Sequence, residues 1–323
     1  MPATQLNEGK ECDMRIAMYD DDRIGVVAAD DTVVELNELL ERYRPLGPED
    51  LLPDLITHFD GLKSEIERRT DAGGGKPLSD VQLHSPLKRP SKIVCLVGNY
   101  REGTDRPKQI LDIFFKSPES ISGDGDTVIL PPHKASIFHH EAEIAVVIGK
   151  ESKDLTEENA MDAIFGYTVY NDVSARGLGA PSVSSFLGKS FDTFGGFGPW
   201  IMTPDEVGDP HNLHVTVEVD GELRQDYRTS DMERQIPELL TYISSVTPLH
   251  PGDVICCGTN HQGIGAMQDG DTVVTAIDKI GKFALHVKDS EARNWQRGVD
   301  EAMAARVRTS AQNPTPAQAG ESS

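Results

Sequence analysis

The chain has 323 residues and a formal net charge of −22 at pH 7, a length that allows one large domain or two modest ones with ample core. This acidic excess argues against nucleic acid or an anionic membrane as a partner, because no cluster of Lys and Arg offsets it. The four cysteines lack zinc-ligand spacing, so we expect free thiols in a reducing compartment. No apolar signal core or membrane-spanning run is present, and we therefore expect a cytoplasmic protein.

The first part of the chain predicts a flexible tail and then a small α+β domain. Residues 1–13 are polar, whereas residues 14–88 carry short alternating stretches followed by apolar residues at helical spacing. We expect a strand meander over 14–36, helices over 36–43 and 51–69, and a break at Gly73-Gly74-Gly75.

The rest of the chain predicts a larger α+β domain over 89–290. Strand patterns outnumber helices, and no regular strand–helix alternation appears, so we expect a mostly antiparallel or mixed sheet. The expected strands are 93–97, 128–130, 142–148, 167–173, 214–219 with its return after Asp220-Gly221, 254–257 and 273–277, and the expected helices are 156–165 and 237–246. Over 291–323 we expect a helical segment that includes Trp295 and Val299, then a disordered tail from Ala311.

Glu141 and Glu143 stand at the start of an apolar run. Residues i and i+2 of a strand share a face, so in a strand both carboxylates converge on one volume. An edge strand with one solvated face is the ordinary alternative. However, the run from Ile144 to Ile148 is apolar throughout, which is typical of a strand buried on both faces. Carboxylates at such a place repel each other unless a cation lies between them, so the pattern indicates a divalent metal.

Asp172 is the third candidate carboxylate, because it lies late in a predicted strand. Three carboxylates with water suit Mg²⁺ or Mn²⁺. Spacing alone does not join Asp172 to the two glutamates, and an Asp at a strand end is also a common turn former.

The order of several motifs resembles the fumarylacetoacetate hydrolase superfamily over about residues 93–287. The motifs are EAEIAVVIG (141–149), NDVSAR (171–176), GKSFDTF (188–194), GPW (198–200), YRTSDM (227–232), PGDVI (251–255) and GT (258–259). The resemblance implies a mixed β-roll catalytic domain, usually homodimeric, with a divalent metal on Glu141, Glu143 and Asp172.

The resemblance also implies roles for other side chains. Lys189 matches a family lysine near the metal, where its ammonium would neutralise a substrate carboxylate or a developing oxyanion. Asn99 and Tyr100 follow a predicted strand and resemble the start of the family's active-site lid, and Thr259 belongs to a matching motif. Arg176 is a candidate clamp for an acid group, with a surface ion pair as the alternative. Lys116 matches a site-lining position, with an ordinary snorkelling lysine as the alternative.

One departure from the family concerns the activation of water. After the lid motif, hydrolytic relatives usually carry a His and, three residues later, a Glu, whereas this chain has Gly103 and Arg106. We consider Glu102 and Asp105 on the same lid, or His261 after a strand, as replacements. A lone loop histidine is otherwise ordinary polar surface.

His139 precedes the glutamates, and strand alternation would send it, rather than His140, toward the metal face. We expect His139 at most to support the metal ligands from behind.

Three functional hypotheses follow from the resemblance. The first is a hydrolase that cleaves a C–C bond in a 2-oxo or 1,3-diketo acid, such as an acylpyruvate, through a metal-stabilised enolate. The second uses the same site for decarboxylation, isomerisation or lyase chemistry, which needs no attacking water. The third is a metal-binding scaffold without catalysis, which only the missing dyad supports. We expect a small oxo acid as the substrate and Mg²⁺ or Mn²⁺ as the cofactor.

Overall fold

The computed structural model describes residues 14–105, 107–178 and 186–312. The expected tail at 1–13 and most of the tail expected after Ala311 lie outside these residues; Ala311 and Gln312 end the last helix. Among the described residues, none of the helices combines the length and the apolar character needed to cross a bilayer.

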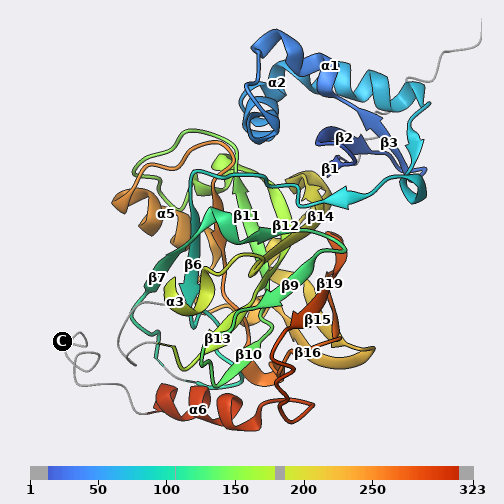
Figure 1. The fold of residues 1–323 in the computed structure, drawn as a ribbon. Coiled ribbons are helices and arrows are strands. Elements are labelled where there is room, and N and C mark those ends of the chain that lie inside the picture. Colours follow the sequence, from blue (N-terminus) through green and yellow to red (C-terminus); the bar gives the residue numbers. More distant parts are fainter. Residues whose placement is uncertain (1–13, 106, 179–185, 313–323) are drawn as a thin grey trace, which may run out of the picture.

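The N-terminal unit pairs a small antiparallel meander with a long helix (Figure 1). The predicted helix after residue 51 is confirmed, and it buries Leu52, Leu55 and Ile56. Pro48 at its first turn fits this position, since proline lacks the N–H that a helix start leaves unpaired. The elements are β1 (Arg15–Tyr19), β2 (Arg23–Val27), β3 (Thr32–Glu35), α1 (Asn37–Leu40), α2 (Pro48–Ala72), β4 (Lys76–Pro77) and β5 (Leu83–His84).

A mixed sheet of 12 strands forms the centre of the molecule, in the order β4-β3-β2-β1-β14-β12-β11-β17-β6-β7, with β5 beside β1 and β8 beside β14. The N-terminal strands thus continue the same sheet, because β1 pairs with β14. Most pairs are antiparallel, whereas β17 and β6 are parallel, so the expectation of a mixed sheet is confirmed. The remaining strands are β6 (Ile93–Val97), β7 (Asp112–Lys116), β8 (Ile121–Ser122), β11 (Ala142–Ile148), β12 (Ile164–Asp172), β14 (Gly195–Met202) and β17 (Val254–Cys256).

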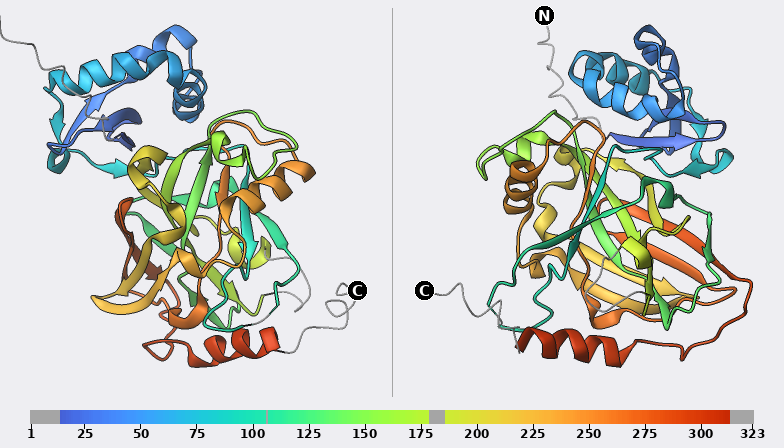
Figure 2. Two further views of the ribbon diagram at one scale, coloured as in Figure 1. Left: turned by 180° about the vertical axis from the view of Figure 1, so that it is seen from behind. Right: turned by 60° about the vertical axis from the view of Figure 1, so that its left-hand side comes forward.

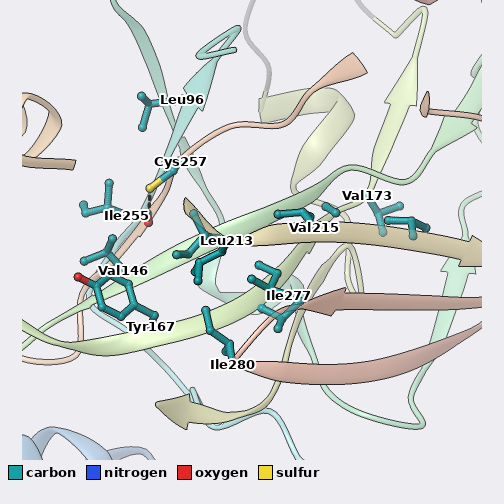
Figure 3. Packing of buried hydrophobic residues seen from close by; sticks show 14 of the residues in the cluster. Leu96, Val146, Tyr167, Val173, Leu213, Val215, Ile255, Cys257, Ile277 and Ile280 are labelled. Carbon is teal, nitrogen blue, oxygen red and sulfur yellow. Dashed lines mark hydrogen bonds between the residues drawn. The ribbon is translucent and has the colours of Figure 1, made fainter. Parts of the chain in front are cut away.

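A second sheet packs on one face of the first, with β18 and β19 against β12. Its order is β16-β15-β18-β19-β9. Figure 3 shows side chains of the buried cluster between the layers, among them Val146, Tyr167, Leu213 and Ile277. The strands are β9 (Thr127–Leu130), β15 (His214–Val219), β16 (Glu222–Arg228), β18 (Thr272–Ile277) and β19 (Gly281–Asp289), and the predicted hairpin at Asp220-Gly221 joins β15 to β16.

Short elements complete the fold. A two-stranded ribbon joins β10 (Ile137–His139) to β13 (Ser174–Arg176). The remaining α-helices are α3 (Phe186–Lys189), α4 (Pro204–Val207), α5 (Ile236–Val246) and α6 (Glu301–Gln312). The N-terminal unit and α6 lie at opposite ends of the molecule (Figures 1 and 2).

The helix expected over 156–165 is wrong. A turn and a short 3-10 helix, Ala160–Ala163, stand there, and β12 begins at Ile164. The Asn159 side chain accepts the backbone N–H of Thr156, so Thr156 begins a turn instead of capping a helix. Gly166 lies inside β12, where a Cβ would stand 2.5 Å from the carbonyl oxygen of Met202.

The helical segment expected after residue 291 begins later, at Glu301. The carboxylate of Asp289 accepts the backbone N–H groups of Glu291 and Arg293, and the backbone N–H of Trp295 donates to Gln268. These contacts hold the segment before Asp300 in a non-helical conformation.

Candidate active site

The carboxylates of Glu141, Glu143 and Asp172 converge, as the spacing predicted for the two glutamates and the family resemblance implied for Asp172. Strand β11 is buried on both faces along its whole length, and it pairs antiparallel with β12 so that Ala142 stands opposite Asn171. This register puts Asp172 opposite Glu141, and the backbone N–H of Asp172 donates to the carbonyl of Glu141 at 2.8 Å. Directly opposed residues and residues two apart share a face, so all three side chains meet, with one oxygen of each lying within 4.8 Å of the others.

Two lysines neutralise part of this charge. Lys189 Nζ bridges Glu141 Oε2 at 2.6 Å and Asp172 Oδ2 at 2.5 Å. Burial would lower the pKa of Lys189, but Asp172 and Glu141 outweigh it and raise that pKa above its usual range. On the opposite side of the aspartate, Lys116 Nζ donates to Asp172 Oδ1 at 2.5 Å, and the hydroxyl of Tyr170 donates to the same oxygen at 2.7 Å.

Lys189 reaches the cluster because α3 lies close against β13. A Cβ at Gly188 would stand 2.5 Å from the carbonyl oxygen of Ala175, so only glycine allows this approach. Lys116 is placed by β7, and its ammonium is fully buried. The structure places the Lys116 ammonium against Asp172. A contact between Lys116 and the substrate stays a prediction.

Glu143 has the least compensation of the three acids. Its Oε2 accepts the backbone N–H of Gly258 at 2.7 Å, but among the described residues it forms no ion pair. Burial, and then the charge of Asp172, raise the pKa of Glu143 well above its usual value. A buried carboxylate in this position suits a cation ligand, and an all-oxygen donor set suits Mg²⁺ or Mn²⁺. These residues therefore fit a divalent metal.

Glu141 faces the opposite electrostatic situation. Burial would raise its pKa, but Arg176 and Lys189 outweigh burial and hold the pKa of Glu141 well below its usual range. The Arg176 guanidinium forms an ion pair with Glu141 Oε1, and its Nε donates to His139 Nδ1 at 3.2 Å. His139 thus contacts Arg176, which pairs with Glu141; its expected support of the metal ligands stays a prediction.

His261 and Glu102 form a dyad beside the acidic cluster. His261 Nδ1 lies 2.7 Å from Glu102 Oε1, and the other ring nitrogen, Nε2, lies 3.9 Å from Glu141 Oε1. The Glu102 carboxylate also accepts the backbone N–H of His261 at 3.1 Å and the side-chain amide of Gln262. Sequence analysis named these residues as separate candidates, and the structure brings them together.

The lid residue Glu102 is held in a left-handed conformation, with φ of 57°. Its backbone N–H donates to Asp231 Oδ2 at 2.9 Å, and the Asn260 amide donates to the same oxygen at 3.1 Å. Burial raises the pKa of Asp231. Asp231 thus ties the lid to the loop that carries His261, whereas Asp105, the other lid candidate, has no comparable contact among the described residues.

Two residues predicted to contact substrate are buried. Tyr100 is fully buried and packs edge-to-face on Tyr227, with ring centroids 5.0 Å apart. Thr259 Oγ1 accepts the side-chain amide of Gln225 at 2.8 Å. Their contact with substrate stays a prediction.

Sequence reasoning missed Tyr170 and Asp300. Tyr170 stands two residues before Asp172 on the same strand face, and this spacing could have revealed it. Asp300 Oδ2 lies 3.0 Å from His139 Nε2. An Asp before a helix is a recognisable cap, but nothing in the sequence indicates its contact with a residue 161 positions away.

A separate cavity of about 540 Å³ lies between β1, β14 and the turn joining β18 to β19. Arg15, Trp200 and Lys279 are among its lining residues, and no member of the acidic cluster is. We place the site at the carboxylates, because three buried acidic side chains converge there beside a histidine.

Comparison with known proteins supports the resemblance seen in the sequence. A family profile described as "Fumarylacetoacetate (FAA) hydrolase C-terminal" matches residues 92–288. The chain is 33% identical over 297 residues to maleylpyruvate hydrolase of Aquipseudomonas alcaligenes, covering 85% of this chain and 99% of the relative. It is 33% identical over 289 residues to an oxaloacetate tautomerase of Bacillus subtilis (strain 168), covering 82% and 95%.

A solved structure shares the fold. Maleylpyruvate hydrolase from Sphingobium sp. SYK-6, in complex with manganese(II) and pyruvate, superimposes with a TM-score of 0.77 at 34% identity, covering 85% of this chain and 99% of that one.

Proposed function

This chain belongs to the fumarylacetoacetate hydrolase family, and we propose that it is a divalent-metal-dependent hydrolase that cleaves a C–C bond in an acylpyruvate-like 2-oxo or 1,3-diketo acid. The observation that carries the proposal is the convergence of the buried trio Glu141, Glu143 and Asp172 with the His261–Glu102 dyad. The relatives named for maleylpyruvate hydrolysis support this substrate class.

The metal would be held by Glu141, Glu143 and Asp172. When bound, a divalent ion supplies a Lewis acid that polarises a carbonyl oxygen and offsets negative charge. Lys116 and Tyr170 hold the far oxygen of Asp172 and so fix the direction in which its other oxygen points. The backbone N–H of Gly258 does the same for Glu143.

His261 is the proposed general base. Glu102 Oε1 accepts the N–H of His261 Nδ1. In this tautomer Nε2 carries no proton, and its lone pair lies on the side of Glu141. From there Nε2 takes a proton from water as the water oxygen attacks the distal carbonyl. The C–C electron pair leaves with the 2-oxo acid fragment, which then takes up a proton. This dyad would replace the His and Glu that relatives carry at the positions of Gly103 and Arg106.

Arg176 and Lys189 would bind the acid. Arg176 presents a planar fork suited to a carboxylate, and its side chain is partly exposed at the edge of the cluster. Lys189, held between Glu141 and Asp172, provides a positive charge where an oxyanion develops.

A second candidate is tautomerisation of a 2-oxo acid. It is favoured by the similarity to an oxaloacetate tautomerase. Keto–enol exchange needs only a proton shuttle, and His261 Nε2 provides one without water.

A product assay separates the two candidates. The protein loaded with Mn²⁺ or Mg²⁺ is incubated with maleylpyruvate, other acylpyruvates and oxaloacetate, and the products are identified by mass spectrometry. Pyruvate and a second carboxylic acid support hydrolysis. An unchanged mass with accelerated keto–enol exchange supports tautomerisation, and carbon dioxide supports decarboxylation.

Variants test the assigned residues. We expect His261→Ala to lower kcat by about 10²–10³-fold, and Glu102→Gln to lower it less, because the base remains but loses its orientation. Glu143→Ala and Lys189→Ala should abolish turnover. If every activity survives both of these last changes, the chain is a scaffold and the enzyme proposal is wrong.

We also infer that the ion is Mg²⁺ or Mn²⁺ and that the protein works as a cytoplasmic homodimer on a small oxo acid, without nucleic acid. The Mn²⁺ complex of the Sphingobium relative supports manganese, the buried free thiols Cys95, Cys256 and Cys257 support a reducing compartment, and the family resemblance supports the dimer. Light scattering during size-exclusion chromatography measures the mass of the protein and so tests whether it is a dimer.

A further inference from the structure

Asp300 lies outside residues 92–288, which the family profile matches, yet it contacts His139, two positions before Glu141. Asp300 contacts His139, His139 contacts Arg176, and Arg176 pairs with Glu141. We propose that Asp300 is a positioning residue for Arg176, and that it acts through His139 to fix the direction in which the guanidinium meets a substrate carboxylate. The inference rests on the proposed function, in which Arg176 binds that carboxylate.

The first step is the protonation of His139. A guanidinium N–H only donates, so Arg176 Nε, at 3.2 Å, requires His139 Nδ1 to accept and hence to carry no proton. The ring proton is then on Nε2, which donates to Asp300 Oδ2 at 3.0 Å. His139 is fully buried, so an acceptor at Nε2 is needed to keep this tautomer.

The second step is the orientation of Arg176. Its donors form a rigid planar fork, so contacts at Nε with His139 and at a terminal nitrogen with Glu141 fix the plane of the whole group. Without Asp300, His139 gains freedom to carry its proton on Nδ1. Two donors would then face each other and the contact at Arg176 Nε would be lost.

Asp300 is itself firmly held. Its Oδ1 accepts the backbone N–H of Met303 at 3.0 Å, which makes it the cap of α6. Its backbone N–H donates to the carbonyl of Ile264 at 2.8 Å, and the neighbouring Val299 forms a β-bridge with Gly265. The segment is therefore anchored next to the loop that carries His261.

The cap role and the positioning role can be separated by substitution. Asp300→Ser keeps a good helix cap, but its side chain is too short to reach His139. Glu301→Ala, at the exposed first position of α6, is the matched control for any general effect on the helix.

Affinity for oxalate, an unreactive dicarboxylate, is measured by calorimetry on the Mn²⁺-loaded protein, beside affinity for Mn²⁺ alone. We expect Asp300→Ser to weaken oxalate binding about tenfold, the size expected for one well-placed hydrogen bond, with Mn²⁺ affinity unchanged. Glu301→Ala should stay within about twofold of the parent. In an Arg176→Ala background, Asp300→Ser should add no further loss. In turnover assays the change should appear in KM rather than kcat.

Two results would overturn the proposal: oxalate affinity unchanged in Asp300→Ser, or a loss that persists undiminished in the Arg176→Ala background. Asp300→Gly, also a tolerated cap, serves as the second variant if the serine variant does not fold. The oxalate titration does not depend on turnover. A parent protein without hydrolase or tautomerase activity would therefore contradict the proposed function while the titration still reads the effect of Asp300.

Discussion

At the scale of single residues, the site depends on buried polar groups whose protonation is fixed by their neighbours. His140 is a clear case outside the metal face. The amide nitrogen of Gln225 donates to Thr259 and to the carbonyl of Asn260, so the Gln225 oxygen, 3.0 Å away, accepts from His140 Nδ1. His140 Nε2 has no hydrogen-bond partner among the described residues. Burial therefore lowers the pKa of His140 to about 4.

This depressed pKa predicts a loss of stability on the acid side. Between the usual histidine pKa of 6.5 and about 4, the unfolded chain binds a proton that the folded chain does not, so the free energy of unfolding falls as the pH falls. His140 alone contributes up to about 1.4 kcal/mol per pH unit to this slope. Urea unfolding of the metal-free protein at pH 7, 6 and 5 measures it. His140→Asn, which keeps a donor for Gln225, should show a shallower slope; equal slopes would contradict the assignment.

Residue-scale chemistry was only partly predictable. The spacing of Glu141 and Glu143 predicted that both side chains lie on one face of a strand. The apolar run to Ile148 predicted that this strand is buried. The join to Asp172 needed the family resemblance, because strand register is set by tertiary pairing rather than by local pattern. The partnership of Glu102 with His261 is formed across 159 positions, and no local signal encodes it.

At the scale of elements, glycines decide where strands and helices approach each other. Gly166 in β12 has no room for a side chain, since a Cβ would lie 2.5 Å from the backbone oxygen of Met202 and 2.6 Å from a methyl of Ile201. Gly61, on the exposed side of α2, has nothing within 4 Å of such an atom. The same residue type is thus required in one element and costly in the other.

Alanine substitution at these two positions should have opposite effects. We expect Gly61→Ala to stabilise the protein by about 0.5–1 kcal/mol, because helical glycine loses more backbone entropy on folding. Gly166→Ala should destabilise it by about 1–3 kcal/mol through overpacking against the backbone. Denaturant midpoints of the two variants measure both changes. A stabilised Gly166→Ala protein would show that β12 and β14 can separate without cost.

The same element explains an incorrect prediction. Residues 156–165 have a helical pattern, yet Ile164 and Phe165 join β12 because tertiary pairing with β11 buries them. Helix propensity is a weak prior that such packing overrides. Helix α2 was predictable because its apolar residues recur at helical spacing over a long stretch. The Asp220-Gly221 hairpin was predictable because its turn signal is also local.

At the scale of the whole molecule, the protein carries a net charge of −22, and its buried carboxylate cluster is also acidic. Such a field attracts divalent cations to the surface in general, so specific binding must be separated from this background. The buried cluster differs from surface acids because its carboxylates repel one another in the folded state, and a bound ion removes that cost.

Metal should therefore stabilise the fold measurably. At a free Mn²⁺ concentration of about 100 times Kd, linkage adds about 2.7 kcal/mol to the free energy of unfolding, and a chelator should reverse the gain. Thermal unfolding with and without Mn²⁺ checks this. Glu143→Gln should remove most of the gain, whereas Glu218→Gln on the exposed side of β15 controls for surface binding. An equal gain in both variants would place the ion elsewhere.

The pairing of β11 with β12 has a consequence for how the protein loses function. Two of the cation-binding acids lie in the neighbouring strands β11 and β12, which residues 149–163 join, and Glu141 directly precedes β11. The proton acceptor instead depends on Glu102 and His261, which meet across 159 positions. A contact between remote segments carries a larger entropic cost than one between segments nearer in sequence. A partly unfolded chain would therefore still bind the ion after it had lost its catalytic activity.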